Sequence, residues 1–320
     1  MRVLFVTNHV PFDRVGAFAA VGRRVELDLV TYGGRLQHGS EPVAGHGRPV
    51  AEREVRGLAA TGGYDAVVCG TGGRVALPGA YAGARRAGVP FVLWASLWAH
   101  PRTLAHALSY LPLLRIYRGA DAVVTYGEHV SAYVRTHGAR RVHVAPQAVD
   151  NGFWAQPSGA PDDGFTVLFV GRDEPGKGLR VLLDAWDGDG RLGILTGGAT
   201  PDEVRNFYAR ASVLVVPSVR TRAFREPWGL AINEAMNQRT AIIASDEVGA
   251  VAGGLVRHER NGLVFGAGDV GGLAQAIARL RSDRELRDRL ADNGTRDVAA
   301  YTHEAWAAGV EAALREALDC

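Results

Sequence analysis

The sequence predicts an α/β protein of two domains, each built on a mostly parallel sheet. Short apolar runs such as RVLFVT at residues 2–7 and FTVLFVGR at residues 165–172 are typical of strands buried on both faces. Such runs alternate with helical patterns along the chain, which is the order expected of βαβ units. A length of 320 residues suits two ordinary domains. The stretch 151–164, rich in Pro, Gly and Asp, fits an interdomain linker.

The first predicted domain covers residues 1–150 and resembles one doubly wound unit. Strands are expected at residues 2–7, 65–70, 89–94, 121–126 and 142–146. Helices are expected at residues 49–60, 75–87, 102–118 and 128–137. The Gly-rich turn GTGG after residue 69 lacks the third glycine of a dinucleotide fingerprint at its proper spacing, so this pattern does not indicate a dinucleotide site.

The second predicted domain covers residues 151–301 and repeats the alternation of strand and helix. Strands are expected at residues 165–172, 191–197, 212–218 and 241–245, and helices at 178–186, 202–211, 269–281 and 283–291. Residues 302–320 form a final helical segment, which we treat separately because it can cross back to the first domain.

The stretch from Pro217 to Ser245 gives the strongest functional signal. The pattern predicts an apolar strand, an arginine-rich loop, a short helix that begins at about Leu230, and then the next strand. Two carboxylates, Glu226 and Glu234, lie eight positions apart in the loop and the helix. Open α/β sheets bind ligands at the carboxyl ends of their strands, where helix N-termini favour anions. The pattern therefore suits a diphosphate held beside hydroxyl groups, although two solvated acids would have the same spacing.

The charge of the chain is uneven. Residues 1–150 hold 17 Lys plus Arg against 10 Asp plus Glu, a net charge of +7, whereas residues 151–320 hold 19 against 24, a net charge of −5. A basic N-terminal half suits an anionic partner such as lipid head groups, or is a solvated arginine-rich face. No basic stripe interleaved with aromatic residues indicates nucleic-acid binding. The chain has 35 arginines and one lysine, Lys177.

The remaining composition points to a cytoplasmic protein. No run approaches the roughly 18 apolar residues of a membrane span, and Met1 leads directly into a predicted strand, which leaves no room for a signal peptide. The two cysteines, Cys69 and Cys320, are far apart in the sequence and suit reduced thiols. The apolar segment 102–118, edged by arginines, leaves a peripheral contact with the inner face of an anionic membrane open.

Several ordered motifs resemble one family. The segment EPWGLAINEAM followed by AIIAS resembles the pattern of the retaining glycosyltransferases of family 4, in which two glutamates are separated by seven residues. Upstream, FVGRDEPGKGLRVLLDAW and APQAVDNGFW match further family segments in order, and YARASVLVVPS and GLVRHERNGLVF add weaker support. The resemblance covers about residues 121–280. It implies a GT-B fold, in which two Rossmann-like domains face each other across a cleft that binds the donor.

The resemblance also implies roles for single residues. Arg172 and Lys177 would hold the diphosphate, Glu226 the sugar hydroxyls and Glu234 the ribose diol of a nucleoside-diphosphate sugar, most simply UDP- or GDP-linked. The donor-binding residues expected on this basis are Gly16, Gly171, Arg172, Lys177, Gly197, Glu226, Pro227, Trp228, Gly229, Leu230 and Glu234. Those expected to act in the chemistry are Glu226, Arg172, Lys177 and His100, with His9 as a reserve for the histidine that faces the sugar.

Two departures from the family pattern concern the first domain. Family members carry a Gly-Gly pair and a long helix after the first strand, but this chain has only Gly16 and a short segment there. His100 lies six residues past Trp94, which is later than the family places its histidine. We therefore treat the first domain as a reduced acceptor-side domain.

No metal or other cofactor is expected. The pair Asp187 and Asp189 in DGDG looks like a metal-binding motif, but it lies at the amino end of a predicted strand, which is the wrong end for a ligand site. The GT-B pattern does not require a metal.

The expected function is therefore metal-independent transfer of a hexose-type sugar, with retention of configuration, from a nucleoside-diphosphate sugar to an acceptor hydroxyl. The acceptor can be a small molecule, a glycan or a lipid. Two alternatives stay open: a nucleotide-sugar epimerase, and a non-catalytic protein that binds sugar nucleotides.

Overall fold

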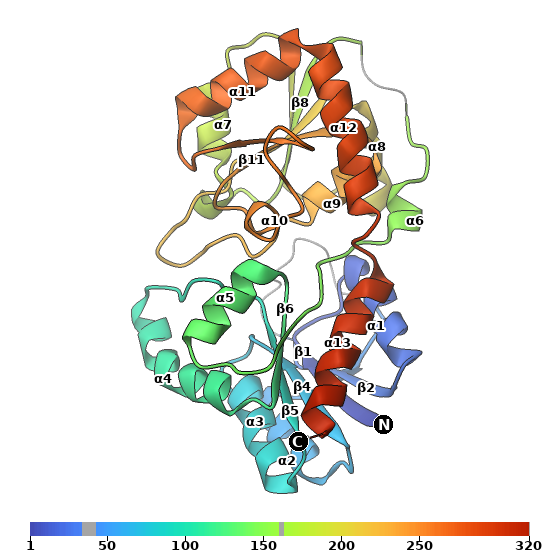
Figure 1. Ribbon diagram of the computed structural model, residues 1–320, viewed down its shortest axis with the longest axis vertical. Coiled ribbons are helices and arrows are strands. Elements are labelled where there is room, and N and C mark those ends of the chain that lie inside the picture. Colours follow the sequence, from blue (N-terminus) through green and yellow to red (C-terminus); the bar gives the residue numbers. More distant parts are fainter. Residues whose placement is uncertain (34–42, 160–162, 320) are drawn as a thin grey trace. The chain divides into compact units, whose positions relative to one another are not determined.

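The computed structural model describes residues 1–33, 43–159 and 163–319 (Figure 1). Its contacts divide the chain into two compact units. The first unit contains Met1–Pro146 together with the chain from His303 onward, and the second contains Gln147–Thr302.

The first unit is built on a parallel sheet that the described residues form from seven strands in the order β3-β2-β1-β4-β5-β6-β7. The strands are β1 (Arg2–Thr7), β2 (Glu26–Thr31), β3 (Arg48–Pro49), β4 (Ala66–Gly70), β5 (Phe91–Ala95), β6 (Ala122–Thr125) and β7 (Val142–Val144). The apolar runs form the central strands because both faces of a parallel sheet are covered. Val3 through Val6 of β1 are fully buried. From β1 the strand order runs outward in both directions, through β2 to β3 on one side and from β4 to β7 on the other, as in doubly wound sheets.

Helices flank this sheet in the first unit. They are α1 (Phe12–Gly22), a 3-10 turn at Glu52–Glu54, α2 (Val55–Thr61), α3 (Ala76–Ala87), α4 (Leu104–Gly119) and α5 (Glu128–Thr136). The segment after β1, which the sequence suggested to be short, is an 11-residue helix that buries Phe18 and Val21. The helix expected at residues 49–60 is shorter than predicted, because β3 and the 3-10 turn precede α2.

The last helix, α13 (His303–Leu318), completes the core of the first unit and lies beside α1 (Figure 1). Its Trp306 is fully buried among aromatic rings of β1, α1 and β5. The ring centroid of Trp306 lies 5.5 Å from that of Phe18 and 5.6 Å from that of Trp94, both in edge-to-face geometry that aromatic pairs prefer. The guanidinium of Arg14 lies over the Trp306 ring at 5.9 Å.

The second unit contains a parallel sheet in the order β12-β11-β10-β8-β9 within the described residues. The strands are β8 (Thr166–Val170), β9 (Arg191–Leu195), β10 (Val213–Val216), β11 (Ala241–Ser245) and β12 (Leu263–Phe265). Its helices are α6 (Asn151–Trp154), α7 (Leu179–Ala185), α8 (Pro201–Arg210), α9 (Ala231–Asn237), α10 (Gly249–Ala252), α11 (Val270–Ser282) and α12 (Arg284–Val298), with a 3-10 turn, η2, at Pro175–Lys177.

An apolar cluster covers one face of the sheet in the second unit. Leu182 of α7 and Ile277 of α11 are among the buried side chains that cover one face of the sheet formed by β8, β10 and β11. Residues 151–164, expected to be a linker, begin with the helical turn α6, and its Trp154 is buried against Tyr208. Among the described residues, no helix combines the length and the apolar character that a membrane span needs.

Candidate functional site

The candidate site of the second unit centres on an ion pair between Lys177 and Glu226. The Lys177 Nζ lies 2.5 Å from the Glu226 Oε2, although the two residues are 49 positions apart in the sequence. The Glu226 side chain is only 5% exposed and that of Lys177 is 21% exposed. The hydroxyl of Ser218 donates a second hydrogen bond to the same carboxylate oxygen, at 3.2 Å. Burying a carboxylate this deeply is costly unless it is paired and hydrogen-bonded.

The sheet order explains why these two residues meet. Lys177 belongs to the loop that follows β8, Glu226 belongs to the loop that follows β10, and β8 pairs with β10 in parallel. Both loops therefore leave the same edge of the sheet, at the carboxyl ends of the strands. A backbone hydrogen bond from the Val219 N–H to the Gly176 carbonyl, at 2.9 Å, joins the two loops directly.

Glycine fixes the shape of the lysine loop. Gly178 has a φ of +72°, in the left-handed region that side chains disfavour. A Cβ at this position would lie 1.9 Å from the Pro217 carbonyl oxygen. Any residue other than glycine would therefore prevent the loop from approaching the end of β10 this closely. The Phe224 ring packs over this loop, with the Lys177 Nζ 5.4 Å from its centroid. The lysine is thus held by the close contact of two loops.

Trp228 anchors the segment after Glu226. Its side chain is 2% exposed, and its indole Nε1 donates to the Asn233 Oδ1 at 2.8 Å. The amide of Asn233, which is fully buried, donates to the Gln147 carbonyl oxygen at 3.1 Å. Gly229 follows with a φ of +94°. This chain of hydrogen bonds holds Pro227, Trp228 and Gly229 in place before α9.

Glu234 lies in the first turn of α9, which begins one residue after Leu230. The hydroxyl of Tyr208, from α8, donates to the Glu234 Oε2 at 2.7 Å. Tyr208 is fully buried, so desolvation raises the pKa of its phenol well above 10, and the charge of Glu234 and the hydrogen bond to it raise the pKa further. Tyr208 therefore stays protonated and keeps the Glu234 carboxylate in a fixed orientation.

The other predicted residues of this unit lie at the same edge of the sheet. Gly171 and Arg172 follow β8, and the Gly171 N–H donates to the Leu195 carbonyl oxygen of β9 at 3.0 Å. The guanidinium of Arg172 pairs with Glu174 at 2.8 Å, and both side chains are partly exposed. Gly197 lies two residues beyond β9 with a φ of +145° and no neighbouring atom within 4 Å of a Cβ position.

The two predicted residues of the first unit have structural contacts. The Nε2–H of His100 donates to the His106 carbonyl oxygen at 2.8 Å, and the His100 ring lies edge-to-face against Tyr110 at 5.0 Å. Gly16 lies inside α1, where a Cβ would come within 2.3 Å of the His303 ring of α13. Helix packing thus accounts for a glycine at this position by itself. The donor-binding role of Gly16, the catalytic role of His100 and the reserve role of His9 stay predictions.

The acidic pair in DGDG has a structural partner. The Arg281 guanidinium forms ion pairs with Asp187 at 2.5 Å and with Asp189 at 3.3 Å. The hydrogen bond from Arg281 is the main reason why the pKa of Asp187 lies below its usual value. Among the residues that the structure describes, no group of three or more His, Cys, Asp or Glu side chains is placed to hold a metal ion.

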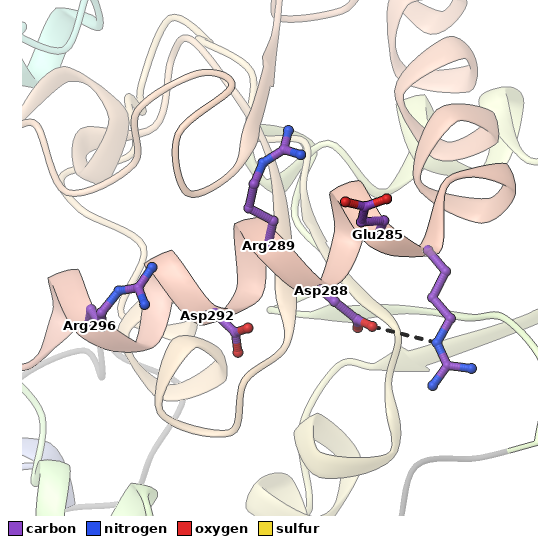
Figure 2. Close-up of a pocket in the computed structure, with 6 residues that line it drawn as sticks. Glu285, Asp288, Arg289, Asp292 and Arg296 are labelled. Carbon is purple, nitrogen blue, oxygen red and sulfur yellow. Dashed lines mark ion pairs between the residues drawn. The ribbon is translucent and has the colours of Figure 1, made fainter.

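A shallow depression on the second unit lies along α12 (Figure 2). All of its lining residues belong to that helix: Arg284, Glu285, Asp288, Arg289, Asp292 and Arg296. It carries three arginines and three acidic residues, and Arg284 pairs with Asp288 at 3.5 Å. Such a row is typical of a solvated helix face.

Among the residues that touch the candidate site, Ser218, Asn233 and Tyr208 were not predicted from the sequence. Ser218 is the last residue of the predicted strand 212–218, and Tyr208 belongs to the motif YARASVLVVPS, so both positions carried a signal that sequence reasoning left unused. Asn233 lies inside the helical pattern and had no such signal, because its partner Gln147 is 86 positions away.

Comparison with known proteins bears on this same region. Residues 194–297, which include Tyr208, Glu226 and Glu234, match the family model described as glycosyl transferases group 1. This segment of the chain is therefore similar to the corresponding part of glycosyltransferases.

Curated relatives agree over about half of the chain. An uncharacterized glycosyltransferase of Methanocaldococcus jannaschii is 28% identical over 177 residues, which cover 46% of this chain and 43% of the relative. A lipopolysaccharide core biosynthesis glycosyltransferase of Rhizobium meliloti is 30% identical and covers 46% of this chain and 47% of that protein. A phosphatidyl-myo-inositol mannosyltransferase of Mycobacterium leprae is 31% identical, with shares of 46% and 45%. The matches thus span about half the length of these relatives.

Solved structures agree over the whole chain and give the fold. HepE of Anabaena, solved with UDP and glucose, has a TM-score of 0.74 at 16% identity, covering 98% of this chain and 99% of that one. A sucrose-phosphate synthase of Thermosynechococcus elongatus has a TM-score of 0.73 at 20% identity, with shares of 99% and 98%. The predicted fold class is confirmed: the chain has the GT-B fold, with two parallel-sheet α/β units.

Proposed function

We propose that the protein is a retaining, metal-independent glycosyltransferase that moves a hexose-type sugar from a nucleoside-diphosphate sugar to an acceptor hydroxyl. The observation that carries this proposal is the Lys177–Glu226 pair at the carboxyl ends of adjacent parallel strands. It lies where α/β sheets bind ligands, and Glu226 belongs to the segment 194–297 that matches glycosyl transferases group 1. We propose a UDP- or GDP-linked donor, and the solved complex of HepE with UDP and glucose supports a donor of this type.

Lys177 and Arg172 are assigned to the donor diphosphate. When the bond between the sugar C1 and the phosphate oxygen breaks, negative charge grows on the leaving diphosphate, and fixed cations stabilise that charge. In the described structure the charge of Lys177 is balanced by Glu226. We infer that the diphosphate shares the ammonium of Lys177 with Glu226 once the donor binds.

The carboxylates are assigned to hydroxyl groups. Glu226 would accept hydrogen bonds from the transferred sugar, and Glu234 from the ribose diol, with Tyr208 holding the Glu234 carboxylate in place. The new bond forms between the acceptor oxygen and C1, and the acceptor proton passes to the leaving phosphate. This assignment needs no separate base among the protein side chains. His100 would orient the sugar from the first unit.

The two domains are assigned different substrates. Residues 151–301 would bind the nucleotide sugar, and the first domain, with the segment 302–320, would select a small molecule, a glycan or a lipid as acceptor. We propose that the protein acts in the cytoplasm, with access to the inner membrane face. Nucleic acid is not among the partners proposed.

The test is a thermal-shift screen of the purified protein against UDP, GDP, ADP and TDP, with Lys177→Met in parallel. A nucleotide present at 100 times its dissociation constant adds about 2.7 kcal/mol of stability, which is readily measured. We expect one nucleotide to stabilise the wild type and not the variant. Its sugar derivatives are then offered with candidate acceptors, with and without EDTA.

The outcomes separate this proposal from its alternatives. Conversion of the free sugar nucleotide without an acceptor would indicate an epimerase. Binding without any turnover would indicate a non-catalytic sugar-nucleotide-binding protein. Loss of transfer in EDTA would contradict the metal-independent mechanism, and inversion at C1 would contradict retention.

A further inference from the structure

Helix α4 exposes apolar side chains to solvent. Leu108 is 84% exposed and Leu111 is 72% exposed, which makes them the two most exposed large apolar side chains among the described residues. Pro112 of the same helix is also exposed. An amphipathic surface helix ordinarily turns its polar residues outward and its leucines inward. Leu108 and Leu111 depart from this arrangement.

The outward face of α4 ends in cations. Positions 108, 111, 115 and 118 follow the i, i+3, i+7, i+10 spacing of one helix face. On this face Leu108 and Leu111 are followed by Arg115 and Arg118, and both arginines are exposed. The core contacts of α4 come from other positions, mainly Ile116 and Tyr117, which are buried. The packing of the first unit therefore does not use the leucine face.

The surrounding sequence carries no negative charge. Between Asp65 and Asp121 the chain has no Asp or Glu, but it has six arginines: Arg74, Arg85, Arg86, Arg102, Arg115 and Arg118. Helix α3, which follows Arg74, packs against α4. Its N-cap residue Val75 is 50% exposed and is the third most exposed large apolar side chain among the described residues.

The charge of Arg74 reaches α4. Burial, the neighbouring His100 and Arg74 together lower the pKa of His106 in the first turns of α4. Arg74 thus adds a positive charge near the first turns of α4. We call the exposed face of this helix, made of Leu108, Leu111, Arg115 and Arg118, the α4 patch.

From this combination we infer that the α4 patch docks the protein on an anionic lipid surface. Exposed leucines can insert at the boundary between head groups and acyl chains, while arginines beside them contact the anionic head groups. Residues 66–120 contribute no carboxylate that would repel such a surface, and the Glu52 carboxylate accepts hydrogen bonds from the Val75 and Ala76 N–H groups at the N-terminus of α3. The inference extends the proposed access to the inner membrane face by naming the residues that make the contact.

The experiment is co-sedimentation of the full chain with vesicles. Vesicles of phosphatidylglycerol mixed with phosphatidylcholine are compared with vesicles of phosphatidylcholine alone. We expect binding only to the anionic vesicles. Raising the salt from about 0.05 M to about 0.5 M shortens the screening length about threefold, so we expect it to weaken the binding. No donor or acceptor is present, so failure of docking leaves the proposed transfer reaction standing, and the reverse also holds.

Matched variants locate the contact. Leu108→Asp combined with Leu111→Asp should lower the vesicle partition coefficient about tenfold or more, because two apolar contacts are lost and two negative charges are added. Leu183→Asp combined with Phe207→Asp makes the same change at two exposed apolar side chains of the second unit and should leave partition unchanged. Arg115→Gln combined with Arg118→Gln should reduce binding and its dependence on salt. Circular dichroism melting checks that each variant is folded.

Three results would overturn the inference. The first is a wild type that does not bind anionic vesicles, and the second is equal loss in the α4 variant and its matched control. The third comes from analytical ultracentrifugation: a wild-type dimer that Leu108→Asp with Leu111→Asp converts to a monomer would make the α4 patch a contact between two copies of the chain.

Discussion

The Lys177–Glu226 pair allows a double-mutant cycle that separates its structural role from its proposed catalytic role. The variants are Lys177→Met, Glu226→Gln and the combination of both. Lys177→Met removes the cation that pairs with the buried Glu226 carboxylate and leaves the hydrogen bond from the Ser218 hydroxyl in place. Glu226→Gln removes the charge of the carboxylate but keeps its size. The double variant has neither charge.

The expected size follows from the geometry. Two unit charges 2.5 Å apart attract by about 7 kcal/mol at an effective dielectric constant of about 20. The desolvation of both groups cancels much of this attraction. Breaking a buried pair on one side typically costs about 3–5 kcal/mol, and the partial exposure of Lys177 lets water reduce that cost. We therefore expect Lys177→Met to lower the free energy of unfolding by about 2–4 kcal/mol.

The double variant gives the decisive comparison. Because no charge is left unpaired, it should recover at least about half of the stability lost in Lys177→Met, which is about 1–2 kcal/mol. The coupling energy is this recovery plus the cost of Glu226→Gln alone, so it should be at least as large. Activity should not recover, because the diphosphate contact is still missing, and kcat/KM should remain at least about 100-fold below the wild type. Urea unfolding followed by tryptophan fluorescence measures the first quantity, and sugar transfer measures the second.

Either of two results would refute this reasoning. Additive losses of stability would mean that the two charges do not interact in solution. Full activity in Lys177→Met would mean that the lysine does not hold the diphosphate, whatever its effect on stability.

Three further predictions concern other parts of the molecule. Gly178→Ala should lower the free energy of unfolding by about 3 kcal/mol or more, because it adds a clash to left-handed strain; Gly188→Ala, with a φ of +85° and open space around the Cβ, should cost only about 1 kcal/mol in the same urea titration. Tyr208→Phe should cost about 1 kcal/mol of stability. It should also weaken nucleotide binding about fivefold in calorimetry, because the hydrogen bond that orients the Glu234 carboxylate is lost; unchanged affinity would exclude a role of Tyr208 in positioning Glu234. Burial raises the pKa of the Cys69 thiol above its ordinary 9.0, so the unfolded chain loses this proton at a lower pH than the folded protein. The free energy of unfolding should therefore fall above pH about 9, by up to about 1.4 kcal/mol per pH unit. Cys69→Ala should flatten this slope, and an equal slope in both proteins would contradict the assignment.

The sheets could be predicted from the sequence because parallel strands leave a simple mark. A strand covered on both faces must be apolar throughout, as TVLFV and VLVV are, and such runs stand out between helical patterns. The bounds were less certain where local signals compete. Arg48–Pro49 forms an edge strand although no apolar run predicts a strand there. The helix Val55–Thr61 is shorter than the helix predicted at residues 49–60.

The sequence indicated which side chains lie at the carboxyl edge of the second sheet, but not their contacts. The family motif named Arg172 and Lys177, the pattern after an apolar strand named Glu226, and their functional roles stay predictions. The pairing of Lys177 with Glu226 depends on β8 lying next to β10, and strand order is not written in either segment. The same limit applies to α4, whose apolar pattern predicts a helix but does not say which face the rest of the unit will cover.

The placement of α13 in the first unit has a consequence for synthesis of the chain. The second unit is in effect an insertion, since its residues 147–302 all leave the ribosome before His303 does. The first unit cannot close its core around Trp306 until that late segment arrives, although its other strands and helices are made first. The second unit can therefore complete its core earlier, reversing the usual N-terminal-first order of folding. Until α13 is synthesised, Phe18 and Trp94 of the first unit lack their contact with Trp306. Premature termination after Thr302 should therefore destabilise the first unit more than the second unit, although the second unit is next to the point of termination.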